Sequence, residues 1–289
     1  EGTAPNVVTF NALMHVCERS GRWRTALALV DTMRSASLKP DAITYTGLIG
    51  ALEKSNRWQL ALETFEEMKL SGVQPDTVVY NAIVAALERG GRWDCALERY
   101  HEMERLGVPR TIQCYNPLLS ALWNGGQFED ALAVFSCAIN SKVYPDAKVQ
   151  RDDDSLLQDL HLMSAGAALV QTTLWLVDLE QRVKDANKSA MYNLPENIVL
   201  VTGWGKHSRE VGTCEVKDAV VEFLDAMDSP FHVPEDNPGR MVARHTDVED
   251  WIRDLSTPIH VSCQNFCKDK ARPQPLLSEQ SSSQDASAT

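Results

Sequence analysis

The sequence predicts an α-helical solenoid followed by a small α/β domain. Two observations lead to this fold class. Landmark residues recur every 35 positions as far as residue 146, and a fixed period of this length is typical of stacked helical repeats. Beyond residue 146 the period stops, and short β-branched runs alternate with stretches of helical spacing, which indicates an α/β layer.

Four repeat units of 35 residues are predicted, at 7–41, 42–76, 77–111 and 112–146. Their landmarks are an aromatic residue (Trp23, Trp58, Trp93, Phe128), a following alanine (Ala26, Ala61, Ala96, Ala131), a methionine (Met33, Met68, Met103) and a proline (Pro40, Pro75, Pro145). Residues 1–6 align with the end of an earlier unit, so we expect the array to continue upstream.

Each unit reads as a pair of helices. In the first unit Thr9 is expected to cap a helix that Gly21 ends, and a second helix is expected from Arg22 to Met33. One such pair cannot bury its own apolar face, so neighbouring units must stack. The repeated aromatic residue is therefore predicted to lie in the core between units rather than in a ligand site.

Composition and charge narrow the possible functions. The chain has 289 residues, 44% of them hydrophobic, and a net charge of −12, which argues against sequence-independent coating of nucleic acid. Residues 1–146 are nearly neutral, with 14 basic and 17 acidic side chains, so local base recognition stays compatible. No membrane partner is expected, because no apolar run approaches the roughly 18 residues of a membrane span. The seven scattered cysteines contain no C-x-x-C pair, which predicts neither a disulfide framework nor a zinc ribbon.

The repeat resembles the pentatricopeptide repeat (PPR) family. The units open VVTFN, AITYT, TVVYN and IQCYN, and three of them close on Pro-Asp. This resemblance implies a groove that holds single-stranded RNA at about one base per repeat. It also implies that the fifth and last residues of each unit read the base. These pairs are Asn11 with Asp41, Thr46 with Asp76, Asn81 with Thr111, and Asn116 with Asp146.

By the same resemblance an Asn/Asp pair favours uracil and a Thr/Asp pair favours guanine, and we interpret the atypical Asn/Thr pair as favouring a pyrimidine. The implied site is 5′-U-G-Y-U-3′. The second residue of each unit is expected to wedge between bases; it is apolar in three units (Val8, Ile43, Val78) and Gln113 in the fourth. The thirteenth residue offers a cation for a phosphate in three units (Arg19, Lys54, Arg89) and is Asn124 in the fourth, although a cation also suits a helix C-terminus.

After residues 147–155, which read as a linker, a second domain is predicted at 156–265. Strands are expected at 156–162 and 198–201, with a helix capped by Ser164 between them. Further helices are expected at 216–227 and 247–255, and a last strand at 259–262. Residues 266–289 form a Ser/Gln/Pro-rich segment that is predicted to be disordered.

Two motifs of this domain together resemble the small MutS-related (SMR) domain. Asp159-Leu160-His161 lies at the end of the first strand, and Thr202-Gly203-Trp204-Gly205-Lys206-His207-Ser208 directly follows the second. The resemblance implies a nucleic-acid site at these strand ends, and some SMR proteins cleave RNA or DNA. Gln158 departs from the leucine that many members carry beside the motif.

The candidate chemistry can be assigned residue by residue. His161 and His207 are candidate base and acid for phosphodiester cleavage, with Lys206 adding positive charge. Asp159 either orients His161 or holds a divalent cation such as Mg²⁺; no cofactor is otherwise indicated. Thr202, Gly203, Gly205 and Ser208 are candidate phosphate-loop residues, because glycine permits a close backbone approach.

A structural interpretation of the same residues remains open. Asp159 and His161 alternate on the predicted strand, so one of them can be a buried polar group, and Gly-x-Gly after a strand is often only a turn. The combined resemblance to PPR–SMR proteins implies an RNA-processing protein of the chloroplast, with the mitochondrion as the alternative. It also leaves a non-catalytic RNA-binding regulator or a protein scaffold, including one in plastid-to-nucleus signalling, as the alternative function, with other organelle gene-expression proteins as partners.

Overall fold

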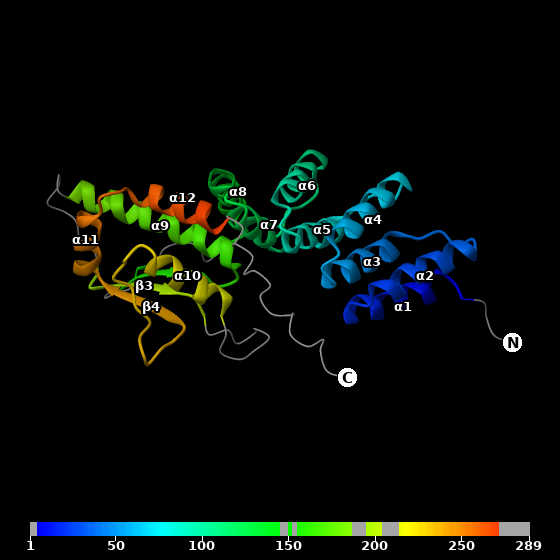
Figure 1. Cartoon of the computed structure of the whole chain (residues 1–289), viewed down its shortest axis with the longest axis horizontal. Helices are drawn as coiled ribbons and strands as arrows, with labels where there is room; N and C mark the ends of the chain where they lie inside the picture. Colours follow the sequence, from blue (N-terminus) through cyan, green and yellow to red (C-terminus); the bar gives the residue numbers. More distant parts are fainter. Residues whose placement is uncertain (1–4, 145–149, 152–154, 187–194, 204–213, 272–289) are drawn as a thin grey trace, which may run out of the picture.

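The computed structural model describes residues 5–144, 150–151, 155–186, 195–203 and 214–271. Two parts lie side by side, a row of paired helices and a small sheet with its own helices (Figure 1). Buried apolar residues form one continuous cluster that runs from Met14 in the first helix to Cys267 in the last. The two parts therefore share a core instead of meeting across a solvated linker.

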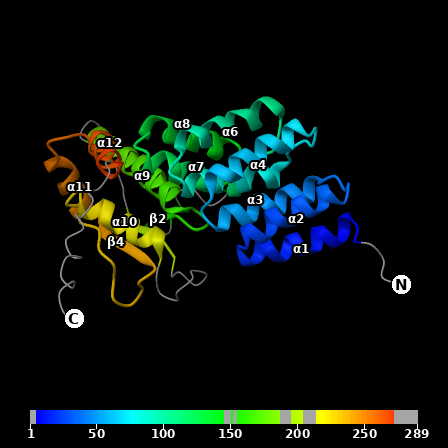
Figure 2. The same cartoon turned by 45° about the vertical axis from the view of Figure 1, so that its right-hand side comes forward.

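Four helix pairs make up the first part. The first helices of the pairs are α1 (Val7–Ser20), α3 (Ala42–Lys54), α5 (Thr77–Arg89) and α7 (Ile112–Asn124). The second helices are α2 (Trp23–Ser35), α4 (Trp58–Leu70), α6 (Trp93–Leu106) and α8 (Phe128–Asn140). Each first helix packs against the next first helix along the array, which gives the solenoid that the period predicts (Figure 2).

The residue before each first helix is its N-cap residue, and in three of the four helices the side chain of this residue accepts from the helix backbone. The Asp41 side chain accepts from the backbone N–H of Thr44 at 2.9 Å, and Asp76 accepts from Val78 and Val79 at 3.0 Å each. In the first unit the cap is Asn6, whose Oδ1 accepts from the Thr9 N–H at 3.1 Å. The prediction that Thr9 caps this helix was therefore wrong, because the helix begins at Val7, earlier than its apolar pattern.

The repeated aromatic residues lie between units, as predicted. A Cβ added at Gly90 would come within 2.3 Å of Trp58 Cδ1 of the preceding unit, and one at Gly125 would come equally close to Trp93 Cδ1. Glycine at these places lets the indole ring press on the backbone of the next helix. The stacked units are thus held by direct ring-to-backbone packing.

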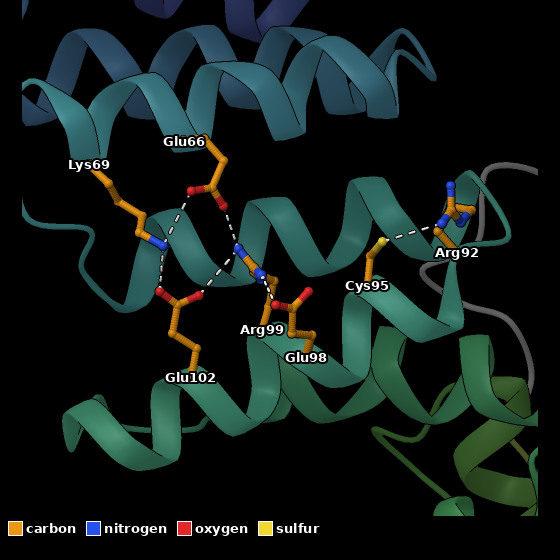
Figure 3. A network of polar contacts seen from close by, with 7 residues as sticks. All are labelled: Glu66, Lys69, Arg92, Cys95, Glu98, Arg99 and Glu102. Carbon is orange, nitrogen blue, oxygen red and sulfur yellow. Dashed lines mark hydrogen bonds and ion pairs between the residues drawn. The ribbon is translucent and has the colours of Figure 1, made fainter.

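A buried ion network joins the second helices of units two and three (Figure 3). Arg99 of α6, only 7% exposed, contacts Glu66 of α4 at 2.6 Å, Glu98 at 2.8 Å and Glu102 at 3.3 Å. Lys69 contacts Glu102 at 2.7 Å, so Glu102 bridges the two basic side chains Lys69 and Arg99. Because the guanidinium is desolvated, it depends on these carboxylates for compensation.

The second part is built on a four-stranded sheet in the order β1-β2-β3-β4. The strands are β1 (Gln150–Arg151), β2 (Ser155–Asp159), β3 (Asn197–Val201) and β4 (Arg240–Arg244). β2 and β3 are parallel, and the outer pairs β1–β2 and β3–β4 are antiparallel. The parallel pair is joined through α9 (Ala165–Ala186), as the prediction of strand, helix and strand requires.

α9 also continues the solenoid. It packs against α7 in the way α7 packs against α5, and it contacts the helices α10 (Glu215–Asp225), α11 (His245–Asp254) and α12 (Ile259–Lys270) on its other sides. A Cβ at Gly166 would lie 2.5 Å from the Ser120 Cα, so this junction is backbone-tight. α9 is therefore at once the crossover helix of the sheet and the next first helix of the array (Figures 1 and 2).

Two boundaries differ from the prediction. Residues 259–262 are the start of α12 and not a strand, because the apolar residues Ile259, Cys263 and Cys267 share one buried helix face against α9. α12 continues to Lys270, so the first residues assigned to the disordered tail are helical; residues 272–289 lie outside the described residues. On the edge away from β2, β3 pairs with β4, which lies in a segment where no strand was predicted.

Burial raises the pKa of Cys263 to about 12 and that of Cys267 to about 11, which makes both thiols unreactive. Across the described ranges no helix is long and apolar enough to cross a membrane.

Candidate nucleic-acid interface

Exposed apolar side chains mark the first turn of three successive first helices. Val8 is 73% exposed, Ile43 64% and Val78 57%. Gln113 takes the equivalent place on α7 and is exposed as well. Large apolar side chains thus recur on the surface at intervals of 35 residues. Packing within the chain does not explain their exposure, so they mark a surface that a partner can cover.

The paired polar residues of the first unit lie in contact next to this series. The Asn11 amide nitrogen donates to both carboxylate oxygens of Asp41 at 3.1 Å, and the Thr44 hydroxyl donates to Asn11 Oδ1 at 2.7 Å. Burial alone raises the pKa of Asp41, yet the hydrogen bonds from Thr44 and Asn11 outweigh it and lower the pKa below its usual value. Asp41 is thus held ionised beside the asparagine.

The second and third units vary this arrangement. Thr46 donates its hydroxyl to the Ala42 carbonyl at 2.7 Å, and Asp76 is engaged with the backbone of α5, so each is tied to its own helix end. In the third unit Asn81 Nδ2 donates to the Thr111 hydroxyl at 3.2 Å. Asn81 Oδ1 is buried and has no hydrogen-bond partner among the described residues.

The fourth unit uses its asparagine differently. Asn116 Nδ2 donates to the carbonyl of Leu162 at 2.8 Å, and Asn116 Oδ1 accepts from the Tyr144 hydroxyl at 2.8 Å and from the Ser164 N–H at 3.0 Å. Three of the four positions of the amide are occupied, two of them by the segment before α9. Asn116 is thus bonded to the segment before α9, and its assignment as a base reader stays a prediction; its expected partner Asp146 lies outside the described residues.

The cations of the thirteenth position are paired with glutamates of the unit before. Lys54 lies 3.7 Å from Glu18, and Arg89 lies 2.9 Å from Glu53. Arg19 is exposed at the end of α1. Such half-exposed pairs contribute little to stability, so a phosphate can compete for the cations. Asn124, at the same position of the fourth unit, is uncharged.

A histidine–carboxylate pair lies at the end of β2. Asp159 Oδ1 accepts from the backbone N–H of His161 at 2.8 Å and lies 2.5 Å from His161 Nδ1. The strand ends at Asp159, so His161 lies in the following turn; the prediction that both alternate on one strand was wrong. The His161 side chain is 53% exposed, and with Nδ1 on the carboxylate its Nε2 has no hydrogen-bond partner among the described residues.

Gly203 brings the second motif to the same place. A Cβ at Gly203 would lie 3.3 Å from His161 Nε2, and Gly203 has a φ of +83°, so a larger residue would be strained and crowd the imidazole. The N–H groups of Thr202 and Gly203 both donate to the carbonyl of Gly239, at 3.0 and 3.1 Å. These two N–H groups are therefore not free phosphate donors, contrary to their prediction as phosphate-loop residues.

The rest of that loop, with Gly205, Lys206, His207 and Ser208, lies outside the described residues. Within the described residues, no group of three or more His, Cys, Asp or Glu side chains has the arrangement of a metal site. Gln158, the departure beside the motif, is fully buried and accepts from Gln171 of α9 at 2.8 Å, so it ties the strand to the helix.

No motif or spacing in the sequence singles out Leu162 or Tyr144. Both contact Asn116, across 46 and 28 residues of chain. Leu162 is 66% exposed and has a φ of +66°, a conformation that a leucine rarely adopts. In the structure Leu162 differs from Leu160 and Met163, the apolar residues on either side of it, because both of these are buried.

The stacked helix pairs define the first part as a helical-repeat solenoid. Models described as the PPR repeat family match residues 5–54 and 44–87, and the PPR repeat matches residues 78–108 and 113–143. This part of the chain is thus built of pentatricopeptide repeats.

Curated relatives agree with this assignment. Pentatricopeptide repeat-containing protein At1g74750 of Arabidopsis thaliana is 31% identical over 123 residues, and At1g18900 of the same plant is 32% identical over 123 residues. Each alignment covers 43% of this chain, which spans only about 14% of the length of these relatives. At3g18110, named chloroplastic, is 30% identical over 96 residues, 33% of this chain and 6% of its own length.

Solved structures with similar helix arrangements include two with RNA. PPR10 in complex with an 18-nt psaJ RNA element is 20% identical at a TM-score of 0.47, covering 80% of this chain and 30% of its own. The PPR domain of Arabidopsis thaliana protein-only RNase P 1, in complex with tRNA, is 12% identical at a TM-score of 0.49, covering 86% of this chain and 99% of its own.

Proposed function

We propose that the repeats of this chain bind single-stranded RNA base by base. The observation that carries the proposal is the exposed apolar series Val8, Ile43 and Val78, which runs beside the paired polar residues at a spacing of one unit. Apolar side chains stack on any base, and the neighbouring polar groups select its identity by hydrogen bonds. The near neutrality of this part suits recognition of few bases rather than long-range attraction.

A base exchange tests this function. The protein is titrated into fluorescein-labelled RNAs that differ only at the second base of the U-G-Y site, and binding is followed by anisotropy. Thr46→Asn is expected to move the preference at this base from guanine to uracil, with each wrong base costing about 1–3 kcal/mol. Thr32→Asn, on the exposed face of α2, is the matched control. An unchanged preference in Thr46→Asn would contradict the assigned register.

We further propose that the α/β part is an SMR-type domain that cleaves the bound strand. The support is the Asp159–His161 pair, in which Asp159 contacts Nδ1 and leaves Nε2 directed towards Gly203. In this scheme Nε2 takes the proton of a ribose 2′-hydroxyl, whose oxygen attacks the adjacent phosphorus. The 5′-oxygen leaves with a proton from a second group, for which Lys206 and His207 are the candidates.

End-labelled RNA with UGCU and UGUU sites separates cleavage from binding. Discrete products in Mg²⁺ that vanish in His161→Ala and His207→Ala, but persist in His232→Ala, are expected. A parallel reaction in EDTA decides whether a divalent cation takes part. Intact RNA that the protein still shifts on a gel would replace cleavage by the non-catalytic regulator or scaffold.

The cellular setting is proposed from the relatives. They are plant proteins and one is named chloroplastic, which favours an organelle, the plastid before the mitochondrion, as the place of action. Fluorescent tagging of the full-length protein in plant cells tests this; a nuclear or cytosolic signal would contradict it.

A further inference from the structure

The turn between β2 and α9 presents an apolar side chain to solvent in a strained conformation. Leu160 and Met163 at its ends are buried, while Leu162 is 66% exposed with a φ of +66°. Both the exposure and the left-handed backbone oppose folding, and they persist only if the surroundings impose them. Strain of this kind points to a role outside the packing of the chain.

Asn116 is the group that imposes this conformation. Its amide donates to the Leu162 carbonyl at 2.8 Å, and its Oδ1 is fixed in turn by Tyr144 and by the N–H of Ser164. Ser164 also donates its hydroxyl to the Asn116 carbonyl at 2.9 Å. The turn is thus bound to the first helix of the fourth unit at Leu162 and at Ser164.

The place of this contact in the array is informative. Asn11 and Asn81, at the same position of their units, contact Asp41 and Thr111, which cap the next first helix. Asn116 likewise contacts Ser164, whose hydroxyl accepts from Ala167 N–H at 3.3 Å at the start of α9. The turn at Leu162 therefore stands where the array would meet its next nucleotide, after the one at unit 77–111.

Resting on the proposed RNA binding, we propose that this turn is a nucleotide subsite. Leu162 stacks on the base that follows the nucleotide read by Asn81, and it supplies an apolar contact to the unit whose second residue is the polar Gln113. Asn116 is a positioning residue, because it holds Leu162 without touching the base. The subsite accepts any base, since leucine offers no hydrogen bond to a base edge.

This placement also determines which phosphate of the RNA lies beside His161. His161 directly precedes Leu162, and its Nε2 faces Gly203. A nucleotide stacked on Leu162 carries its own backbone past His161, so the strand is presented next to the third read base. The distance between the read sequence and the cleaved bond is then fixed by the Asn116 contact and not by a flexible tether.

The test uses RNA with the fluorescent base 2-aminopurine as the fourth nucleotide, after U-G-C. Its fluorescence rises when it leaves the RNA stack, so binding to the wild-type chain is expected to raise it. Leu162→Ala should abolish most of this rise and weaken binding by about threefold. Leu70→Ala, which truncates an 88% exposed leucine on α4, should leave both unchanged.

A second variant separates a binding role from a structural one. Leu162→Gly removes the side chain and relieves the positive φ, so its Tm should equal or exceed that of the wild type while the fluorescence rise is lost. With natural RNAs, changing the fourth base should alter the Kd less than about twofold, against about tenfold at the third base.

Two results overturn the proposal in different ways. RNA that binds with the expected preference at the first three bases, but with a fluorescence rise that survives in Leu162→Ala and Leu162→Gly, removes the subsite and leaves the repeat function intact. RNA that shows no base preference at any position removes the proposed function and the subsite together.

Discussion

The third and fourth units carry the same asparagine at the same position and put it to different use. Asn81 donates to Thr111 and keeps Oδ1 without a partner among the described residues. Asn116 has that oxygen occupied by Tyr144 and Ser164 and its nitrogen by Leu162. The same asparagine thus contacts the next repeat where one follows it, and it contacts the segment before α9 where the array meets the α/β part.

The two seams beside these asparagines differ in their chemistry. Within the array, the seam between units two and three is held by an ion network on the second helices and by a tryptophan on a glycine. At the end of the array, α9 meets α7 through a backbone-tight glycine contact and hydrogen bonds to Asn116. Substitutions in each of these two seams, and at the two asparagines, therefore have different expected effects on stability and on RNA binding.

The largest effect is expected from the ion network of Figure 3. Arg99→Leu leaves Glu66 and the nearly buried Glu102 without their guanidinium, which should lower the free energy of unfolding by about 3 kcal/mol. Arg92→Leu is the control, because its partner Asp94 is half-exposed and should be worth less than about 1 kcal/mol. Urea unfolding measures both. Equal losses would mean that burial does not set the strength of the network.

The junction between α7 and α9 is expected to be disrupted by an added side chain at Gly166, which would overlap with the backbone of α7. Gly166→Ala places a Cβ against the Ser120 backbone and should cost about 2 kcal/mol, because a helix backbone cannot move aside as a side chain can. At Gly107, which has a φ of +67° and nothing within 4 Å of an added Cβ, alanine should cost about 1 kcal/mol through strain alone. Thermal unfolding compares them; a neutral Gly166→Ala would mean that α9 is free to shift along α7.

One substitution made at both asparagines tests their division of roles. Asn81→Thr should change base preference at the third nucleotide, whereas Asn116→Thr should leave base preference alone and lower the free energy of unfolding by about 1–2 kcal/mol through its lost hydrogen bonds. Binding to an RNA panel and urea unfolding are measured on both variants. A fourth-base preference that disappears in Asn116→Thr would restore that residue as a base reader.

The smallest effect concerns the missing cation of the fourth unit. Lys54 and Arg89 face glutamates of the preceding unit, but Asn124 brings no cation to Glu88. Glu88 lines a pocket of about 630 Å³ between α5, α7, α9, α10 and α12. Burial raises the pKa of Glu88, and Glu215 adds to this against the opposing charge of Arg89. Asn124→Lys should lower that pKa and stabilise the chain by about 0.5 kcal/mol.

The sign of the pH dependence follows from the carboxyl group. The gain from Lys at position 124 requires ionised Glu88, so it should be present at neutral pH and vanish as pH falls through the Glu88 pKa. Unfolding across this pH range, repeated in a Glu88→Gln background, measures it. A gain that persists in Glu88→Gln would assign it to the helix end instead.

Much of the solenoid followed from the residues alone. Landmarks such as Trp58 and Gly21 act on their own helix or on the next one, so a 35-residue period predicted the helix pairs, the aromatic seams and the exposed series at Val8, Ile43 and Val78. The resemblance to the PPR family paired Asn11 with Asp41 and Asn81 with Thr111, and both pairs are in contact. Strand β2 with its Asp159–His161 pair was predicted as a motif, though not with the turn that holds His161.

The tertiary structure alone decided where the repeat pattern stops. Gln113 and Asn124 set the fourth unit apart in sequence, but they do not say what Asn116 contacts; its partners Leu162 and Ser164 lie 46 and 48 residues away along the chain. The same holds for the N–H of Gly203, which Gly239 occupies, and for Ile259, which buries a helix face only because α9 is there to receive it. Helix formation is set by neighbours in sequence, whereas the partner of a polar group is set by which segments arrive at the same place.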